Sequence, residues 1–537
     1  MTEESNVYQL YQPIYKEFIN NPKLFKIYYF DDTIDGQTLL EHSLSLAYYL
    51  LERGISKGDR IAVYTQNIPQ FIIAELASWF IGAIVTPLNI MLKSQELEYY
   101  LSDSEARAII ALEREFKENV KPILDRTKVE VIITTIGSDY LTNKVKMLEN
   151  ETKTFPMGKE NDFKSIIERY KGKKVDISIP DREELSMILY TSGTTGKPKG
   201  AMYTHFNLFF TAYVFKEFFG LDRNKDIIGI FTPLSHNIGA CLVAASLYSL
   251  TPALIMYRFE AGEALRLIEK YKVTFGLLPS TGFIALMNHP DFKKRDISSF
   301  RKLWSGGAPV PPSLVEEWEK LTGTYIHTGY GMTETSGTIS MTPLNERAPI
   351  DSETGALAVG KPIPYTEVKI LDPETHKELP IGQVGEIAVR GSHLMKGYWK
   401  KPEETERVMY NGWLLTGDLG KMDEKGWLYY VDRLKDLIVV SGFKVWPREV
   451  EDVIYKHPGV KEVAVVGIPD PYRGEVPKAY VVLKDEWKGK VTEEEIINLV
   501  RKTLANYKVP RAVEFVDELP KTASGKIMRR LLKEKKS

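Results

Sequence analysis

Helical and strand-like hydrophobic patterns alternate along most of this 537-residue chain. Residues 37–51 and 69–80 have the spacing of helices, and residues 60–64 between them have the pattern of a strand. A helical pattern over 261–271 leads into a strand pattern over 273–278. Such alternation predicts parallel or mixed sheets covered by helices. No repeat of 20–50 residues is visible, which excludes solenoids and propellers. Further strand patterns occur at 108–111, 129–134 and 225–231.

Two apolar stretches invite comparison with membrane spans. Residues 71–92 are interrupted by Glu75 and Pro87, which favours a helix that turns into a strand. Residues 238–257 carry no charge and are about long enough to span a bilayer. Pro252 divides this stretch, however, and serine and threonine dilute it. We therefore expect a buried helix followed by a strand, and no transmembrane segment.

Composition limits the classes of partner. Lys and Arg number 71 and Asp and Glu number 72, so the net charge of −1 offers no global field for nucleic acid or an acidic membrane. With 43% hydrophobic residues the chain can bury a large core, so disorder is not expected. The one cysteine, Cys241, excludes an intramolecular disulfide framework and Cys-rich metal sites. The acidic start, 1–5, lacks the features of a secretory signal, so we expect a cytoplasmic location.

The last hundred residues predict a separate small α+β module. Pro447 suits a first helical turn, and Val450, Val453 and Ile454 follow at helical spacing. Residues 463–466 and 479–483 resemble strands, and the segment 492–495 has the sequence of a capping box. The expected fold class is therefore α/β, with a large N-terminal domain of mixed sheets covered by helices and a small α+β C-terminal domain.

The densest chemical signal is Tyr190-Thr-Ser-Gly-Thr-Thr-Gly-Lys-Pro-Lys-Gly200, directly after an apolar strand. Its glycines allow close backbone approach to a ligand, its hydroxyls can donate hydrogen bonds, and Lys197 and Lys199 add positive charge. This composition suits a polyphosphate. The spacing is not that of a Walker A loop, because Pro198 follows the first lysine. An arbitrary glycine-rich segment could equally form a flexible surface loop.

This string resembles the nucleotide loop of the adenylate-forming superfamily, which includes acyl-CoA synthetases, luciferase and nonribosomal adenylation domains. Further segments resemble the superfamily's other motifs in the same order, over nearly the whole chain. They are Trp304-Ser-Gly-Gly-Ala-Pro309, Tyr330-Gly-Met-Thr-Glu-Thr335, Thr416-Gly-Asp418, Asp432-Arg-Leu-Lys-Asp436, Ser441-Gly-Phe-Lys-Val-Trp-Pro447 and Pro520-Lys-Thr-Ala-Ser-Gly-Lys526.

The resemblance implies an ATP site, in which Asp418 holds the ribose hydroxyls and Arg433 also contacts the nucleotide. By itself, Asp418 could be an Asx-turn residue, and Arg433 could form a surface ion pair. The implied ATP-binding residues are Thr191, Ser192, Gly193, Thr194, Thr195, Gly196, Lys199, Gly307, Ala308, Thr328, Gly329, Tyr330, Gly331, Met332, Thr333, Asp418, Arg433 and Lys526.

The catalytic residues implied by the resemblance are Lys526, Glu334 and Arg433, with Glu334 also the Mg²⁺ ligand. Alone, Glu334 could be a surface charge, although hydroxyls flank it and carboxylate oxygen suits Mg²⁺. Lys526 alone would be a solvated lysine. A carboxylate that attacks the α-phosphorus of ATP meets electrostatic repulsion, however, and a lysine that bridges both groups relieves it.

The resemblance also bears on the acid and on coenzyme A. It places His236 and Gly331 at the acyl pocket, and Gly331 stands where relatives restricted to acetate carry a tryptophan. We therefore expect room for a longer chain. Cys241 is better explained as core. The resemblance implies a hinge at Lys435, within residues 433–435, between domains of residues 1–432 and 436–537. Movement about this hinge would bring Ser441 and Gly442 to coenzyme A.

The sequence thus predicts an AMP-forming acyl-CoA synthetase, using ATP, Mg²⁺ and coenzyme A, that acts on a medium- or long-chain fatty acid. A short hydroxy acid, such as hydroxybutyrate, and an aryl acid are the alternative substrates. A homodimer is an open possibility for the oligomeric state. Two different functions compete with this prediction: a nucleotide-binding relative without catalysis, and a P-loop hydrolase, which the Walker A mismatch disfavours. No residue establishes the oxygenation that luciferase requires, and no carrier domain follows Lys526.

Overall fold

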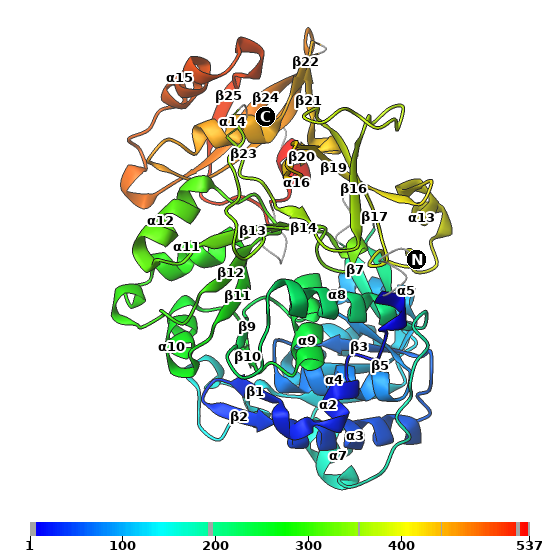
Figure 1. Ribbon diagram of the computed structural model, residues 1–537. Coiled ribbons are helices and arrows are strands. Elements are labelled where there is room, and N and C mark those ends of the chain that lie inside the picture. The colour runs from blue at the N-terminus through cyan, green and yellow to red at the C-terminus, as the bar shows by residue number, and fades with distance from the viewer. Residues whose placement is uncertain (1–6, 192–196, 353–354, 442, 522–526, 535–537) are drawn as a thin grey trace.

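The computed structural model describes residues 7–191, 197–352, 355–441, 443–521 and 527–534. Its described strands form four sheets, and helices pack between and around them (Figure 1). The expected fold class is confirmed. In Figure 1 the six-stranded sheet lies at the bottom and the C-terminal sheet at the top.

The six-stranded sheet has the order β6-β5-β3-β4-β7-β8. Its first five strands run parallel, whereas β8 pairs antiparallel with β7 as a hairpin. Parallel strands need crossover connections, and helices supply most of them here. The elements of this part are α3 (Gly36–Glu52), β3 (Arg60–Tyr64), α4 (Pro69–Phe80), β4 (Ile84–Pro87), α5 (Ser94–Ser104), β5 (Ala106–Leu112), β6 (Val131–Thr135), α7 (Phe163–Tyr170), β7 (Leu185–Thr191) and β8 (Lys199–Thr204).

The nine-stranded sheet has the order β15-β14-β13-β12-β11-β9-β10-β1-β2, and β13 to β10 run parallel within it. Its elements are β1 (Lys26–Tyr29), β2 (Asp32–Asp35), α8 (His205–Phe218), β9 (Ile228–Ile230), α9 (Asn237–Ser249), β10 (Ala253–Ile255), α10 (Ala261–Tyr271), β11 (Phe275–Leu278), α11 (Ser280–Asn288), β12 (Lys302–Ser305), α12 (Pro312–Thr322), β13 (Ile326–Tyr330), β14 (Ser340–Met341) and β15 (Lys361–Pro362).

Both apolar stretches form the expected buried helix followed by a strand. Residues 71–92 contribute most of α4 and all of β4, and every residue of α4 is buried, including Glu75. Residues 238–257 contribute α9 and β10. One hydrophobic cluster joins these helices and α8 to strands of both large sheets. No helix in the described part of the chain is long and apolar enough to cross a membrane.

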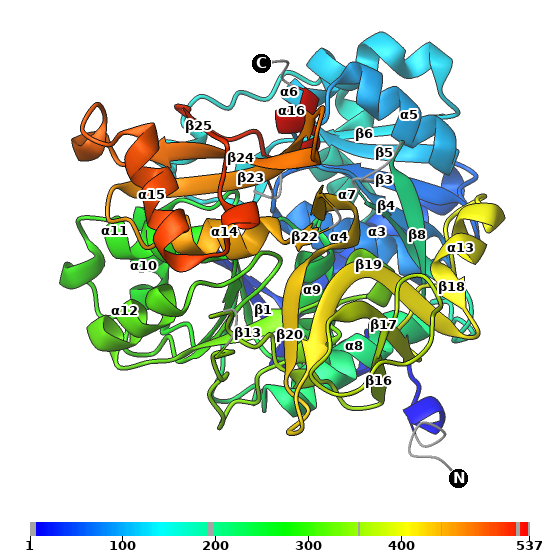
Figure 2. The ribbon, with the colours of Figure 1, turned by 90° about the horizontal axis from the view of Figure 1, so that it is seen from above.

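A five-stranded antiparallel sheet follows, with β16-β17-β19-β18 in order and β20 beside β19. The C-terminal sheet has the order β22-β21-β24-β23, with β25 beside β24 (Figure 2). The elements are β16 (Thr366–Leu371), β17 (Gly385–Gly391), α13 (Pro402–Val408), β18 (Met409–Tyr410), β19 (Trp413–Met422), β20 (Leu428–Arg433), β21 (Ile438–Val440), β22 (Phe443–Val445), α14 (Pro447–Ile454), β23 (Val460–Asp470), β24 (Gly474–Leu483), α15 (Glu493–Thr503), β25 (Ala512–Phe515) and α16 (Arg529–Glu534).

The capping box expected at residues 492–495 is only half formed. The Thr492 side chain accepts a hydrogen bond from the Glu495 N–H, as a helix N-cap should. The Glu495 carboxylate instead lies 3.2 Å from His457 Nε2. Glu495 therefore links α15 to the end of α14 rather than closing its own helix start.

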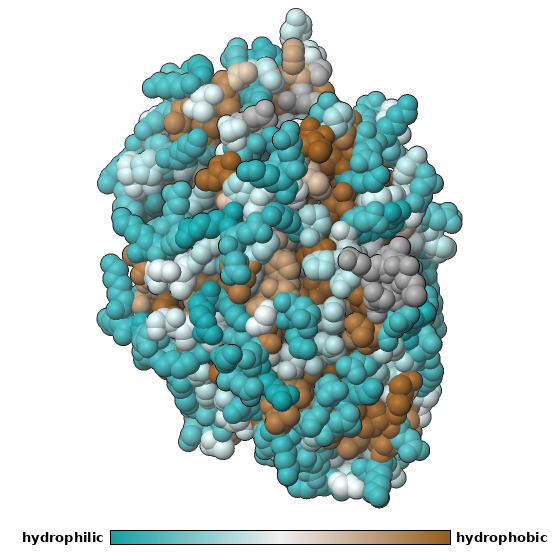
Figure 3. All heavy atoms as spheres, viewed as in Figure 1, coloured by the Kyte–Doolittle hydropathy of each residue, from teal (hydrophilic) through white to brown (hydrophobic). Residues whose placement is uncertain are grey.

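Hydrophobic side chains on the face shown in Figure 3 lie in several patches between hydrophilic residues.

Candidate functional site

The hairpin of β7 and β8 frames the glycine-rich loop. Tyr190 pairs with Gly200, and Thr191 pairs with Lys199, at the end of the hairpin that is next to the loop. The loop follows the carboxyl end of β7, where ligands commonly bind in α/β sheets. The predicted phosphate-binding residues Ser192, Gly193, Thr194, Thr195 and Gly196 lie outside the described residues.

Helix α5 braces this hairpin base. The Tyr190 hydroxyl donates to Asp103 Oδ2 at 2.7 Å, and the Tyr99 hydroxyl donates to the Pro198 carbonyl at 2.7 Å. Lys401 Nζ donates to both the Tyr99 hydroxyl, at 2.9 Å, and Asp103 Oδ1, at 3.0 Å. Both sides of the loop are thus hydrogen-bonded to the same helix.

Lys199, predicted to bind phosphate, is held by an acidic partner. Its Nζ lies 2.5 Å from Glu404 Oε2 in α13 and 5.0 Å from the centre of the Tyr398 ring. The hydrogen bond and charge of Lys199 lower the pKa of Glu404. A phosphate group would therefore compete with Glu404 for the Lys199 ammonium. The sequence contains no sign of this pairing between Lys199 and Glu404.

Glu334 lies in a 3₁₀ turn, Thr333–Thr335, just after β13. Its side chain is largely buried, and Oε1 accepts a hydrogen bond from the Tyr398 hydroxyl at 2.7 Å. The Glu334 carbonyl also accepts from the Met395 N–H at 2.9 Å. A buried carboxylate held at one oxygen can present its other oxygen to a cation.

Two side chains hold the backbone before Glu334. The Tyr203 hydroxyl donates to the Thr333 carbonyl at 2.6 Å, and Asn237 Nδ2 donates to the Met332 carbonyl at 3.1 Å. The Tyr203 hydroxyl also lies 3.0 Å from Asn237 Oδ1. These contacts tie the turn to β8 and to the first residue of α9.

Asp418 and Arg433 are cross-strand neighbours on β19 and β20. Arg433 Nε lies 3.3 Å from Asp418 Oδ1, and the Tyr330 hydroxyl donates to Asp418 Oδ2 at 2.7 Å. Burial and then the charge of Asp418 raise the pKa of Tyr330 well above its usual value, so this phenol remains a donor. The structure thus brings together three residues that the sequence placed at the nucleotide.

Comparison with known proteins agrees with this geometry. Residues 19–399 match the family model described as AMP-binding enzyme, and residues 449–526 match the model described as AMP-binding enzyme C-terminal domain. The chain belongs to this family of AMP-binding enzymes. The predicted membership of the adenylate-forming superfamily is therefore confirmed.

Similar proteins of known name indicate which class of AMP-binding enzyme this chain belongs to. The long-chain-fatty-acid–CoA ligase of Escherichia coli O6:H1 is 38% identical over 512 residues, covering 92% of this chain and 89% of that protein. The ligase of the same name from Bacillus subtilis is 37% identical over 536 residues, covering 96% and 92%. The protein is thus an AMP-forming acyl-CoA synthetase, as the sequence predicted.

Solved structures share the fold. ATP-bound MatB from Rhodopseudomonas palustris has a TM-score of 0.85 at 27% identity, with 99% of this chain and 98% of that chain covered. The anthranilate CoA ligase AuaEII with anthranoyl-AMP has a TM-score of 0.84 at 27% identity, with coverages of 97% and 96%. Apo MatB gives a TM-score of 0.75 at the same identity and coverages as ATP-bound MatB. This synthetase therefore resembles the ATP-bound form more closely.

The structure does not support the prediction that Gly331 leaves open space for a longer acyl chain. A Cβ at this position would lie 2.1 Å from the Gly337 carbonyl oxygen and 2.6 Å from the Thr338 Cα. Backbone, rather than open space, occupies the volume that a side chain would need. Glycine is required here for a close backbone approach, so its presence does not by itself indicate room for a long acyl chain.

Other residues predicted at the nucleotide fall into two groups. Gly307 and Ala308 are exposed after β12, and Gly307 has a φ of +78°. Thr328 is buried, and its hydroxyl donates to the Ala358 carbonyl at 2.7 Å and lies 2.7 Å from the Thr342 hydroxyl. The Thr328 side chain therefore holds the sheet together instead of facing a ligand. Gly329, Tyr330, Met332 and Thr333 continue from β13 into the Glu334 turn.

His236 caps α9. Its Nδ1 lies 3.4 Å from the Ile238 N–H, and the residue is half-buried. Its predicted place in the acyl pocket stays a prediction. Cys241, one turn further along α9, is buried, and burial raises the pKa of its thiol. The core role predicted for this cysteine agrees with its surroundings.

Lys435 lies in a 3₁₀ turn, Leu434–Asp436, between β20 and β21. Burial lowers its pKa from the ordinary value. Next to this turn, burial raises the pKa of Asp432 to about 6, and its carboxylate accepts the Arg448 N–H at 3.0 Å. This bond ties the start of α14 to the end of β20. The hinge at Lys435 stays a prediction.

Lys526 lies outside the described residues. The residues described on either side of it, Lys521 and Ile527, form an antiparallel β-bridge with each other. Arg529 Nη2 donates to both oxygens of Glu451 in α14, at 2.8 and 2.9 Å. Arg529, three residues after Lys526, is therefore tied to α14.

Ser441 has a φ of +49° in the turn between β21 and β22, and its N–H donates to the Arg473 carbonyl at 2.8 Å. Gly442, predicted with it to bind coenzyme A, lies outside the described residues. Their contact with coenzyme A therefore stays a prediction.

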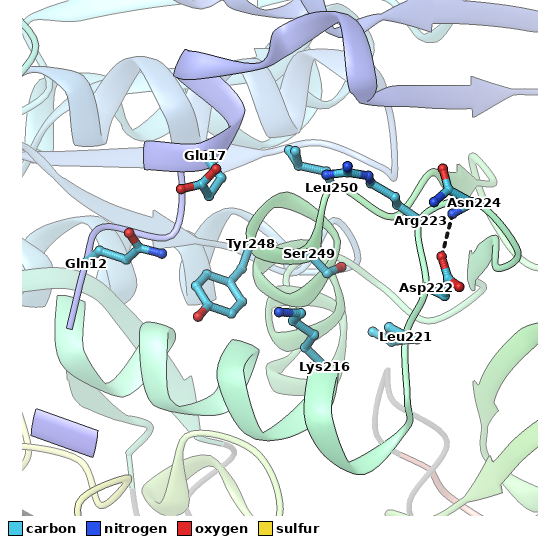
Figure 4. A pocket seen from close by; sticks show the side chains of 10 residues that line it. All are labelled: Gln12, Glu17, Lys216, Leu221, Asp222, Arg223, Asn224, Tyr248, Ser249 and Leu250. Atoms are coloured by element: carbon cyan, nitrogen blue, oxygen red, sulfur yellow. Dashed lines mark hydrogen bonds between the residues drawn. The ribbon is translucent and has the colours of Figure 1, made fainter. Parts of the chain in front are cut away.

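A separate surface pocket of about 660 Å³ lies at the opposite ends of α8 and α9 from the site (Figure 4). Its lining carries two cations and two carboxylates, so it provides neither a cationic cradle for phosphates nor an apolar wall for an acyl chain. The lining residues are Gln12, Glu17, Lys216, Leu221, Asp222, Arg223, Asn224, Tyr248, Ser249 and Leu250.

Proposed function

We propose that this synthetase activates a medium- or long-chain fatty acid with Mg-ATP and transfers the acyl group to coenzyme A. The observation that carries this proposal is the continuous segment from Tyr330 to Thr335. At one end Tyr330 contacts the Asp418–Arg433 pair, and at the other Glu334 contacts Tyr398 beside Lys199. Groups suited to ribose, metal and phosphate are therefore connected through contacts with one short stretch of chain.

In the first half-reaction, a carboxylate oxygen of the acid bonds to the α-phosphorus as the bond to the β-phosphate oxygen breaks. The products are an acyl adenylate and diphosphate. Asp418 can accept hydrogen bonds from ribose hydroxyls, and Arg433 adds positive charge beside it. The Lys526 ammonium then reduces the repulsion between the carboxylate and the α-phosphate.

The Glu334 carboxylate fits a magnesium ion. Mg²⁺ on a nucleotide usually takes one or two protein carboxylates, phosphate oxygens and water. Glu334 provides one such carboxylate, with Oε1 engaged by Tyr398. When bound, the ion supplies positive charge at the phosphates.

In the second half-reaction, the thiol sulfur of coenzyme A bonds to the acyl carbon, AMP leaves with the bonding electrons, and the thiol proton is released. We propose that the domain of residues 436–537 turns about Lys435 between the two steps, so that Lys526 leaves and Ser441-Gly442 approaches the acyl adenylate. The higher TM-score with ATP-bound than with apo MatB supports an arrangement suited to the first step. Two steps that need different groups at one site give this movement a purpose.

The names of the curated relatives from Escherichia coli and Bacillus subtilis support a long-chain acid. The aromatic side chains Phe206, Phe209 and Phe210 on α8 are packed in the core, so they do not themselves support an acyl pocket. A short hydroxy acid and an aryl acid remain the competing substrates.

The test is an acid panel from acetate to palmitate that includes hydroxybutyrate and benzoate, with Mg-ATP and coenzyme A. AMP and thioester are quantified for the parent protein and for Lys526→Ala. We expect equal amounts of AMP and thioester with a medium- or long-chain acid, and loss of AMP in the variant. A preference for hydroxybutyrate or benzoate would refute the fatty-acid assignment. ATP binding without AMP from any acid would favour a non-catalytic nucleotide-binding protein.

A further inference from the structure

We propose that Tyr398 is a positioning residue that orients the Glu334 carboxylate toward a divalent metal ion on ATP. This inference deepens the proposed function and rests on it. Tyr398 is 5% exposed, and its hydroxyl donates to Glu334 Oε1 at 2.7 Å. Among the described residues, this is the side chain that hydrogen-bonds the Glu334 carboxylate.

The backbone of Tyr398 is fixed like a strand. Residues 396–399 run antiparallel to β8, with a β-bridge between Ala201 and Tyr398. The Met202 N–H donates to the Gly397 carbonyl at 2.9 Å, and the Trp399 N–H donates to the Gly200 carbonyl at 2.7 Å. The Tyr398 hydroxyl therefore approaches Glu334 from a rigid base.

This hydrogen bond decides which carboxylate oxygen is available. The last torsion of a glutamate side chain is broad and roughly two-fold, so an unheld carboxylate samples many orientations. A hydrogen bond from a hydroxyl to a charged oxygen is short and strong, and here it occupies Oε1. Oε2 would then be the carboxylate oxygen offered to a metal ion. Groups that fix a metal ligand from behind typically change metal affinity by about 10- to 100-fold.

The same residue also links the metal ligand to the phosphate loop. The Tyr398 ring lies 5.0 Å from Lys199 Nζ, and Glu404, six residues further along, pairs with that lysine. Tyr398 thus stands between the carboxylate meant for the metal and the lysine at the base of the loop.

The proposal is tested with Tyr398→Phe, which removes the hydroxyl and retains the ring. Mn²⁺ binding is measured by electron paramagnetic resonance in the presence of α,β-methylene-ATP, and nucleotide binding is measured separately in EDTA. We expect Mn²⁺ affinity to fall by about 10-fold or more, while metal-free nucleotide affinity changes less than two-fold. Tyr29→Phe is the matched control. Tyr29 lies in β1, away from the site, and the substitution removes a buried hydroxyl that donates to the Gly137 carbonyl.

Glu334→Gln and the double variant distinguish the positioning role of Tyr398 from the metal-binding role of Glu334. If Tyr398 acts through Glu334, adding Tyr398→Phe to Glu334→Gln should cause little further loss of Mn²⁺ affinity. Unchanged Mn²⁺ affinity in Tyr398→Phe, with a loss in Glu334→Gln, would overturn the positioning role alone. Unchanged affinity in Glu334→Gln would overturn the metal role of Glu334 as well. Equal losses of metal-bound and metal-free nucleotide in Tyr398→Phe would indicate a general structural defect and overturn the proposal.

Discussion

Glu75 should make the stability of this synthetase fall as pH rises. Its side chain is 1% exposed within α4, and neither carboxylate oxygen has a hydrogen-bond partner among the described residues. Burial raises the pKa of Glu75 well above the usual 4.5. The folded protein therefore keeps a proton on Glu75 at pH values where the unfolded chain releases it.

The magnitude follows from proton linkage. Below the unfolded pKa, both states hold the proton and Glu75 contributes no pH dependence. Above it, and up to the folded pKa, each pH unit costs about 1.4 kcal/mol of folding free energy. Glu75→Gln cannot ionise and retains nearly the same volume. Its stability relative to the parent should therefore increase with pH between the unfolded and the folded pKa, by about 1.4 kcal/mol per pH unit.

The assay is urea unfolding at pH 5.5, 6.0 and 6.5, followed by tryptophan fluorescence, since Trp79 lies in the same buried helix. Glu118→Gln serves as the control, because Glu118 is a half-exposed carboxylate paired with Arg114. This control should show a nearly constant difference from the parent. A constant difference for Glu75→Gln as well would mean that Glu75 is ionised in the folded state, and the reasoning would be refuted.

Three further outcomes follow from the site. Asp418→Asn removes the charge beside Arg433, and calorimetry should show ATP binding weakened on the order of tenfold; unchanged binding would exclude Asp418 from the nucleotide site. Gly331→Ala should lower stability by about 1–3 kcal/mol in urea unfolding, because its Cβ meets backbone, whereas Gly329→Ala, with its nearest contact at 3.6 Å, should not; equal effects would contradict this. Arg529→Gln removes the ion pair with Glu451 close to Lys526 in the chain; it should slow acyl-adenylate formation more than thioester formation from supplied acyl adenylate, and equal slowing would argue against a role in positioning Lys526.

The sequence predicted the regular elements best where packing follows a local pattern. The boundaries expected for residues 60–64, 69–80 and 261–271 match β3, α4 and α10. Strand β23 is much longer than the four residues expected at 463–466, because its pairing with β24 continues through Gly467 and Pro469 to Asp470. Cross-strand pairing of this kind is set by the partner strand and leaves little trace in local hydrophobicity.

The residues of the site also differ in how far the sequence alone could reveal them. The motif residues Glu334, Asp418 and Arg433 could be singled out because each lies in a distinctive short string. Tyr398 could not, since it contacts Glu334 across 64 residues of sequence and lies in no such string. Gly331 marks a different limit, because a missing side chain can signify either open space or close backbone contact, and only the fold distinguishes them.

The strand-like segment 396–399 has a consequence for synthesis on the ribosome. Strand β8 ends the six-stranded sheet, and its free edge is covered by this segment. Glu404, which pairs with Lys199 in β8, follows Lys199 by 205 residues in the chain. At about 5–20 residues per second, the ribosome therefore makes this covering part of the chain some 10–40 s after β8. During that interval β8 exposes unpaired backbone groups, which can pair with other chains. In a nascent chain, the free edge of β8 is thus a point at which pairing with other chains can begin until residues 396–399 have been made.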